Sequence, residues 1–243
     1  MIEEPYRWLE AIGNRREYVG EQLKGGTPVF AASLPDGILL LGVGAGNTKI
    51  FELFDRHALA GLGHPADIEK IRQAAIDAAH TEAFTRAPED VSLRRLVSFG
   101  LSPQLKTNFE QIFSAPFLLE LLLAELNSKP EDDLLVRLHF DGTFQLETKR
   151  VAVAASKPES ENGARAWLIQ QLPGKDRAQA AELFLQAWWA LSQEKTFSDL
   201  IAADAQRGWR TAVEDKIVEI GWLKRTSSRT ARFESLTLQQ LGL

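Results

Sequence analysis

Cysteine is absent from the 243-residue sequence, and this absence excludes several kinds of chemistry at once. Without thiols the chain can form no disulfide bond, cannot use a cysteine nucleophile and cannot build a cysteine-ligated metal site. A reducing compartment is compatible with such a composition. We therefore expect a cytoplasmic location.

Long hydrophobic runs and an excess of positive charge are also missing. The most apolar run, Phe117–Leu126, contains two glutamates and has roughly half the length of a membrane span. The N-terminal "MIEEPYRWLEAIG" has acidic residues where a secretory signal would have lysines, and it lacks an apolar core. The formal net charge of −5 and the pI near 5.5 argue against a dedicated nucleic-acid binder. We expect neither a membrane nor a nucleic acid as a partner.

Motifs for metals and cofactors are not evident either. The four histidines, His57, His64, His80 and His139, stand alone, without metal-ligand spacing or an obvious carboxylate partner. The glycine-rich segment Gly42–Lys49 lacks the third glycine of a dinucleotide fingerprint and the Gly-Lys-Ser/Thr ending of a P-loop, and a strand-like run follows it. The sequence therefore predicts no metal site and no cofactor.

What is present is an ordinary globular composition with a clear order of elements. Apolar residues at near-helical spacing predict an amphipathic helix over Tyr6–Lys24, and Gly25-Gly26 should end it. Further helices are expected over Ala66–Arg86, Ser92–Phe113 (interrupted near Ser102-Pro103), Ala164–Gln171 and Arg177–Gln193. In the helix over Ala66–Arg86, Ile68, Ile71, Ala75, Ala78, Ala79 and Phe84 should share one face, with Asp67 as the cap.

Short apolar runs bounded by turn residues predict the strands. They cover Val29–Ala32, Ile38–Leu41, Lys49–Phe54, His57–Gly63, Phe117–Leu126, Leu134–Phe140, Phe144–Glu147, Val151–Ala155, Lys216–Leu223 and Thr230–Phe233. The polar segment Pro158–Gly163 is interpreted as a loop, and no linker divides the chain. This order predicts an α+β fold in one domain.

Four segments in register resemble one known family. They are "EAIGNRREYVGEQLKGG" (Glu10–Gly26), "GNTKIFELFDRHALAGLGHPAD" (Gly46–Asp67), "APFLLELLLAEL" (Ala115–Leu126) and "RLHFDGTF" (Arg137–Phe144). The second resembles a family pattern in which a lysine-isoleucine pair precedes "ELYDR", an apolar strand ending in glycine and a long helix. The chain resembles the proteasome α-type subunits, especially those of the actinobacterial kind.

This resemblance implies a four-layer α/β/β/α sandwich of two stacked antiparallel sheets, the N-terminal-nucleophile hydrolase fold, with an extra N-terminal helix. It divides the single domain 1–243 into a gate segment (1–7), the N-terminal helix (8–24), the sandwich (27–235) and a tail (236–243).

The resemblance also implies a role without catalysis. Members of the α class form a homo-oligomeric ring, seven-membered in the family, that caps a ring of β-type subunits, gates the entry of unfolded proteins and docks a hexameric ATPase activator. Lys49 matches the family lysine that receives the activator's C-terminal carboxylate, and Gly25 is assigned to the same docking site. The alternative for Lys49 is an ordinary solvent-exposed lysine at the start of a strand. The gate would consist of Met1, Ile2, Glu3, Glu4, Pro5, Tyr6 and Arg7.

Thr27 is the candidate for a different function, because it follows two glycines and precedes a strand, as the nucleophile of a threonine hydrolase does. In β-type relatives the acid lies sixteen residues after the threonine, and here that position is Val43. Pro28 follows at once and removes an amide from the strand start. Cleavage before Thr27 would also discard the N-terminal helix. We therefore reject Thr27 as a nucleophile and predict no catalytic residue. Two alternatives stay open: a threonine hydrolase that uses Thr27 and Lys49 with an unusual acid, and a scaffold or binding module that kept the fold.

Overall fold

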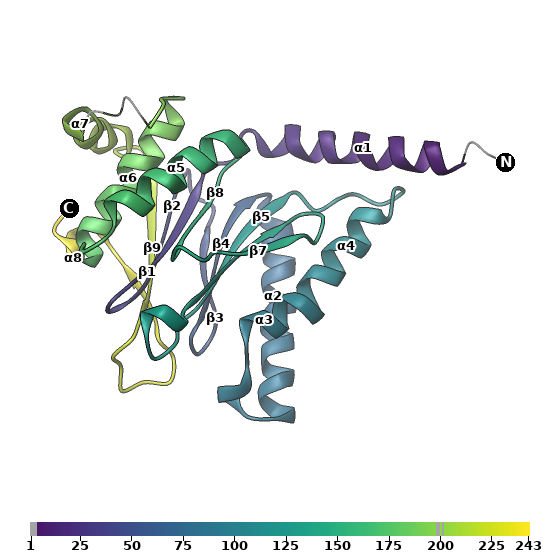
Figure 1. Cartoon of the computed structure of the whole chain (residues 1–243), viewed down its shortest axis with the longest axis horizontal. Helices are drawn as coiled ribbons and strands as arrows, with labels where there is room; N and C mark the ends of the chain where they lie inside the picture. Colours follow the sequence, from purple (N-terminus) through teal and green to yellow (C-terminus); the bar gives the residue numbers. More distant parts are fainter. Residues whose placement is uncertain (1–3, 198–199, 201) are drawn as a thin grey trace.

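Two five-stranded sheets stacked between two helical layers form the body of the protein (Figure 1). In this computed structural model the described residues are 4–197, 200 and 202–243. The expected α+β, four-layer sandwich with an extra N-terminal helix is confirmed.

Each sheet is antiparallel throughout. Sheet I contains, in spatial order, β10 (Phe233–Leu236), β9 (Ile217–Lys224), β2 (Gly37–Gly44), β1 (Val29–Leu34) and β8 (Val151–Ala154). Sheet II contains β3 (Ile50–Phe54), β4 (His57–Gly63), β5 (Leu119–Glu125), β6 (Leu134–His139) and β7 (Phe144–Leu146).

The central strands are continuously apolar because both of their faces are buried. In β1, Phe30 packs into the core between sheet I and its helices, whereas Val29 and Ala31 pack into the core between the sheets. A third core joins sheet II to its helices, with Leu121 and Leu123 of β5 facing it. A strand that is buried on both faces needs apolar side chains at every position, so its sequence does not alternate between apolar and polar residues.

The helices form the outer layers. α2 (Pro65–Thr85), α3 (Leu93–Arg95), the six-residue π-helical turn η2 (Leu96–Leu101) and α4 (Ser102–Glu110) lie on the side of sheet II. α5 (Pro158–Gln171) and α6 (Arg177–Ser192) cover sheet I, and α7 (Ala202–Ala212) packs on α6. Short elements are η1 (Pro88–Asp90), η3 (Pro130–Asp132) and α8 (Leu238–Leu241). The π-helical turn ends directly before Ser102-Pro103, which confirms the expected interruption.

Several predicted boundaries were wrong. Pro158–Gly163 is the first part of α5 rather than a loop, since proline at the first helical position and Glu159 and Glu161 in the first turn are helix-start signals. α7 was not predicted, and the last strand runs over Phe233–Leu236, three residues beyond the expected start.

Two predictions for α2 were also wrong: the burial of Phe84 and the identity of the N-terminal cap. Phe84 is 92% exposed rather than packed beside Ile71. The cap is His64, whose Nδ1 accepts a hydrogen bond from the Ala66 amide, while the Asp67 carboxylate accepts one from the Leu118 amide. Asp67 therefore lies inside the first turn of α2, where it joins the helix to Leu118, directly before β5, and His64 occupies the cap position.

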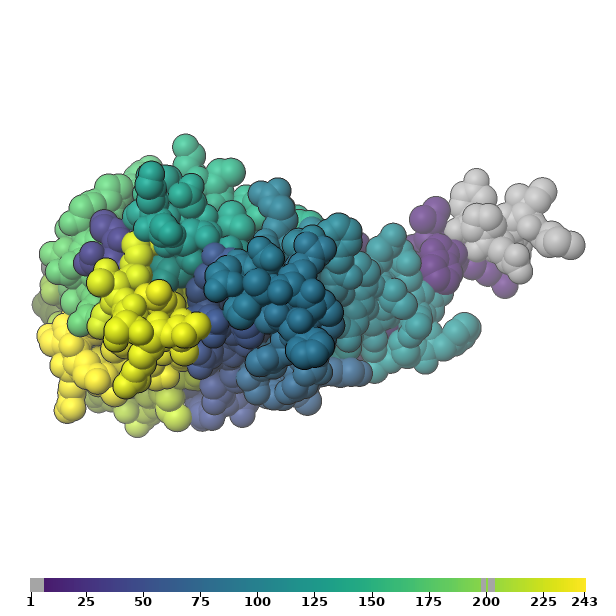
Figure 2. Space-filling model, turned by 90° about the horizontal axis from the view of Figure 1, so that it is seen from below, coloured from purple at the N-terminus to yellow at the C-terminus, as the bar shows by residue number. Residues whose placement is uncertain are grey.

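The N-terminal helix α1 (Glu4–Leu23) extends beyond the rest of the molecule (Figures 1 and 2). Two adjacent arginines hold it to the body. Arg15 donates hydrogen bonds to the carbonyls of Ser114 at 2.6 Å and Asn108 at 3.0 Å. Arg16 forms an ion pair with Asp141 at 2.6 Å. Within the residues that the structure describes, no helix combines the length and the apolarity needed to cross a membrane.

Candidate functional site

Lys49 directly precedes β3, and its side chain lies beside two glycines of β2, Gly42 and Gly44. A Cβ atom on Gly42 or on Gly44 of β2 would lie 3.2 Å from side-chain carbons of Lys49. Side chains on a strand alternate between its two faces. Val43, which lies between the two glycines, therefore points the other way, into the core between sheet I and its helices. The segment "GVG" therefore leaves space for the Lys49 side chain along β2 and turns Val43 away from it.

The Lys49 ammonium has a weak set of partners. Its Nζ donates a hydrogen bond to the Thr27 carbonyl at 3.3 Å, and among the described residues none forms an ion pair with it. Burial lowers the pKa of the Lys49 ammonium below its ordinary value, and the nearby Glu219 carboxylate partly opposes this. Lys49 is thus a half-buried cation rather than a solvated strand-entry lysine.

Glu219 is a neighbour of Lys49 that the sequence did not indicate. It lies on β9 opposite Gly42 of β2. Its two carboxylate oxygens accept hydrogen bonds from the Lys49 amide, each at 3.0 Å, and one of them accepts a bond from the Ile50 amide at 3.3 Å. The carboxylate therefore fixes the start of β3. Its signal in the sequence is a single acid within the apolar run "IVEIGWL".

Thr27 lies close to Lys49, as the threonine-hydrolase alternative requires, but its surroundings differ from that chemistry. The contact to Lys49 uses the backbone carbonyl of Thr27. Val43, where the acid would be expected, is fully buried on the opposite face of β2, and Pro28 is buried in the strand start. The geometry brings threonine and lysine together without placing an acid at the expected position.

The other predicted site residues lie at the two ends of α1 or outside the described residues. Gly25 is exposed in the turn that follows α1, with open space where a side chain would be. Within the predicted gate, Glu4–Arg7 form the first turn of α1, whereas Met1, Ile2 and Glu3 lie outside the described residues.

Two of the four histidines have carboxylate partners, contrary to the prediction. His139 Nδ1 lies 2.8 Å from a Glu120 oxygen, and the fully buried His57 Nε2 lies 3.6 Å from Glu125. Strand pairing brings each pair together from residues distant in the sequence. In the described parts of the chain, no group of three or more metal-ligating side chains is present.

A paired cluster of buried charges lies in sheet II and α5. Arg137 of β6 pairs with Glu120 of β5 and with Glu161 of α5. The Glu161 carboxylate also accepts a hydrogen bond from the Ala155 amide at 3.1 Å. Burial lowers the pKa of the Arg137 guanidinium, and Glu120 opposes this. We call Glu120, Arg137 and Glu161 the arginine cluster; it borders a pocket of about 460 Å³ beneath α1.

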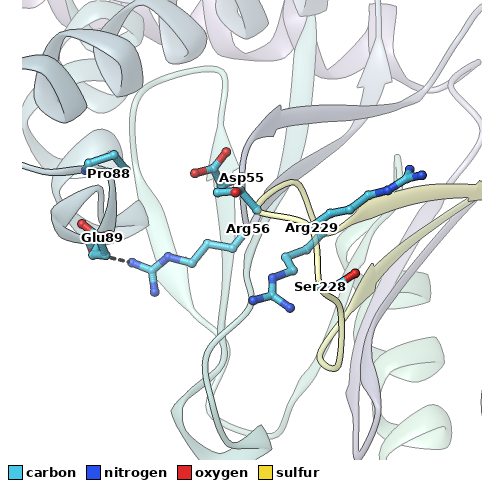
Figure 3. A pocket seen from close by; sticks show the side chains of 8 residues that line it. Asp55, Arg56, Pro88, Glu89, Ser228 and Arg229 are labelled. Carbon is cyan, nitrogen blue, oxygen red and sulfur yellow. Dashed lines mark hydrogen bonds between the residues drawn. The ribbon is translucent and has the colours of Figure 1, made fainter.

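The basic turn between β9 and β10 contains one arginine that is packed against the body of the protein, Arg225. Its guanidinium pairs with the buried Asp133 carboxylate at 2.7 Å. Arg229, from the same loop, lines an open surface pocket together with Arg56 (Figure 3). Arg56 lies in the turn between β3 and β4, and Glu89 lies in η1. In this pocket the Arg56 guanidinium donates a hydrogen bond to the Glu89 carbonyl at 3.1 Å.

Comparison with known proteins gives one consistent result. The chain is 26% identical over 235 residues to the proteasome subunit alpha of Streptomyces griseus, covering 96% of this chain and 80% of that protein. It is 28% identical over 226 residues to that of Kineococcus radiotolerans, with 90% and 88% covered. Over 166 residues it is 30% identical to that of Actinosynnema mirum, with 68% and 62% covered.

No protein-family model matches the chain. The similarity nevertheless extends over nearly the whole sequence and agrees with the two-sheet sandwich and its N-terminal helix. By sequence and by fold, the chain is therefore a relative of the actinobacterial proteasome α subunits.

Proposed function

We propose that the chain is a non-catalytic α-type subunit of a bacterial 20S proteasome core in the cytoplasm. A homo-oligomeric, seven-membered ring of these subunits would cap β-type subunits, gate the passage of unfolded proteins and dock a hexameric ATPase activator. The observation that carries the proposal is the position of α1. It lies directly before Thr27 and is held to the body by Arg15 and Arg16, so the threonine is internal to an ordered chain.

Docking of an activator is assigned to Lys49. A C-terminal carboxylate brought next to its ammonium would add an ion pair to a cation that now donates one hydrogen bond, to a neutral carbonyl. The ion pair would also raise the lowered pKa of Lys49 toward its ordinary value. Gly25, exposed beside the end of α1, leaves space for the backbone of an approaching peptide.

Ring assembly and gating are assigned to α1. Its exposed apolar side chains include Trp8, Leu9 and Tyr18, which are 46%, 67% and 50% exposed. Contact with a neighbouring subunit would bury them, and each would contribute through the apolar area removed from water. Residues Met1–Arg7 would form the gate; of these, Glu4–Arg7 are the first turn of this helix.

The second candidate function is a threonine hydrolase, and one contact favours it. Lys49 Nζ is within hydrogen-bond distance of Thr27, and Glu219 offers a carboxylate close to the same lysine. However, Glu219 already accepts bonds from two backbone amides, and the nucleophile's own amine is joined to Gly26. The non-catalytic proposal requires no change in any of these contacts.

Assembly can be tested by co-expressing the chain with the β-type subunit of the same organism and recording native mass spectra. The proposal expects a particle in which rings of this chain flank rings of the β-type subunit. Monomers that persist in the presence of the β-type subunit would instead support a scaffold without a barrel.

Docking can be tested in the assembled particle with Lys49→Met. We expect ATPase-dependent degradation of an unfolded protein to be lost, while hydrolysis of a short peptide by the β-type subunits continues. Lys149→Met, which removes an exposed lysine in the loop before β8, is the matched control. Equal degradation by both variants would contradict the docking assignment.

A further inference from the structure

The pocket beneath α1, which the arginine cluster borders, has the size of a small-molecule site. Its volume of about 460 Å³ falls within the usual range for such sites, ~300–1,000 Å³. Gly20 and Leu23 of α1 contribute to its wall, and the rest of the wall comes mainly from β5, β6, α5 and the segment around Glu147. One chain supplies all of these residues, so the pocket does not require a second subunit.

Buried carboxylates outnumber the arginines that are available to them in this pocket. Glu120, Glu147 and Glu161 lie in its wall, and their side chains are 8%, 7% and 4% exposed. Arg165 pairs with Glu147, whereas Arg137 is shared between Glu120 and Glu161. Two guanidinium groups therefore serve three carboxylates. A carboxylate removed from water is destabilising unless a cation compensates it.

The third arginine in the wall does not correct this imbalance. Arg16 of α1 forms its ion pair with Asp141, which lies outside the pocket wall. His139 lines the pocket, and its Nδ1 lies 2.8 Å from Glu120 Oε2. A proton on His139 would supply the missing positive charge, and so would a cation that enters from solution.

Glu120 is the carboxylate with the weakest hold on an arginine. The Arg137 guanidinium lies 3.5 Å from Glu120 Oε2, at the limit of a hydrogen bond. Glu161, in contrast, pairs with Arg137 and also accepts a hydrogen bond from the Ala155 amide. The unpaired share of negative charge in the pocket therefore lies at Glu120.

An oxygen of Glu120 that lacks a partner provides the second observation. Among the described residues none donates a hydrogen bond to Glu120 Oε1, and this oxygen is not one of the polar atoms that are fully enclosed without a partner. It therefore borders the open space of the pocket that Glu120 lines, although the residue as a whole is only 6% exposed. A nearly buried carboxylate thus presents a free acceptor to the pocket.

We propose that the pocket beneath α1 binds a small primary amine as its ammonium ion, which donates a hydrogen bond to Glu120 Oε1. A primary ammonium is a compact charge with three donors, and a charge-assisted bond to a carboxylate is among the strong ones. The apolar part of the wall, formed by Leu23, Phe140 and Pro158, suits the hydrocarbon part of an organic amine better than a hydrated inorganic cation.

The test uses the purified full-length chain and n-butylamine at constant, neutral pH. The comparison ligands are n-butanol, which has nearly the same shape without the charge, and potassium chloride. Because the chain has four histidines, the imidazole C–H resonance of His139 can be assigned in NMR spectra with His139→Gln. n-Butylamine should shift this resonance with a saturable dependence on concentration. An equal shift with n-butanol or with potassium chloride would overturn the proposal, whether or not any variant folds.

A matched pair of variants locates the site. Glu120→Gln keeps the shape of the side chain but loses its charge, so it should weaken binding of n-butylamine about tenfold or more. Glu159→Gln removes an exposed carboxylate from the first turn of α5, outside the pocket wall, and should leave binding unchanged. Equal binding by the two variants would overturn the assignment to Glu120.

A last comparison separates a free amine from a lysine side chain, which carries the same ammonium group. Nα-acetyl-lysine amide should bind more weakly than n-butylamine, because its backbone must also fit beneath α1. If the lysine derivative binds more tightly, the assignment to a free small amine is wrong.

Discussion

Two half-buried cations of the same sandwich, Arg137 and Lys49, have opposite surroundings. Arg137 lies between two carboxylates, Glu120 and Glu161, and every charge in that cluster has a partner of the other sign. Lys49 has one neutral carbonyl at 3.3 Å and, among the described residues, no ion pair. A cation that is already paired serves structure, whereas a cation without a counterion can accept an incoming one.

The same burial thus has different consequences at the two sites. It lowers the pKa of both Arg137 and Lys49, but Glu120 offsets this at Arg137 through direct hydrogen bonding and charge, while Glu219 acts on Lys49 from a distance. Removing the paired cation should be destabilising because two buried carboxylates remain. Removing Lys49, the cation without a counterion, should instead raise the free energy of unfolding, because the cost of burying its charge disappears. The predictions below test this contrast, from the largest expected effect to the smallest.

The largest effect is expected for Arg137→Met. The change leaves Glu120 with His139 alone and takes the guanidinium away from the buried Glu161, and breaking a buried pair in this way typically lowers the free energy of unfolding by about 3–5 kcal/mol. Urea unfolding of the isolated chain measures this loss of stability. The triple variant with Glu120→Gln and Glu161→Gln should recover much of the loss. A loss below about 1 kcal/mol for Arg137→Met would show that the cluster is not the structural site described.

A smaller loss is expected for Glu219→Gln. The amide side chain keeps one acceptor oxygen for the amides of Lys49 and Ile50 but loses the charge, so the free energy of unfolding should fall by about 1–2 kcal/mol. Because Glu219 raises the pKa of Lys49, that pKa should fall further in the variant. NMR titration of the Lys49 side chain reports it. An unchanged pKa would mean that the two groups are not coupled.

Lys49→Met should stabilise the isolated chain by about 1 kcal/mol or less near neutral pH, since it removes the burial of a charge. The sign follows from the lowered pKa: the penalty is present below the folded-state pKa and is relieved as pH rises through it toward 10.5. The difference in melting temperature between variant and wild type should therefore shrink in alkali. Destabilisation at neutral pH would contradict the description of Lys49 as an unsatisfied cation.

The smallest effect concerns the Arg16–Asp141 pair, which has one exposed and one buried partner. Burial raises the pKa of Asp141, but bonds from Thr143 and Arg16 outweigh it, so the pKa lies below its ordinary 3.8. The contribution is present above that value and is lost as pH falls below it. Asp141→Asn should weaken the hold on α1 by less than about 1 kcal/mol. Hydrogen exchange of the α1 amides measures this, and unchanged exchange would exclude a role for the pair.

The fold was largely predictable from the sequence, because strands buried on both faces, such as Ile38–Leu41 in β2, appear as unbroken apolar runs. α7 was missed: its apolar residues are few, and Trp209 fills the core from a helix with polar neighbours. At the candidate site, Lys49 was singled out through resemblance to a family, and its docking role stays a prediction. Glu219 was not, since strand pairing brings it to Lys49 from 170 residues away in the sequence.

The most direct test of the central claim is the intact mass of this chain taken from the assembled particle. If Lys49 is a docking cation and the chain is catalytically inert, residues before Thr27 are retained and the mass includes α1. A mature chain that begins at Thr27 would expose a threonine amine beside Lys49 and would contradict the account.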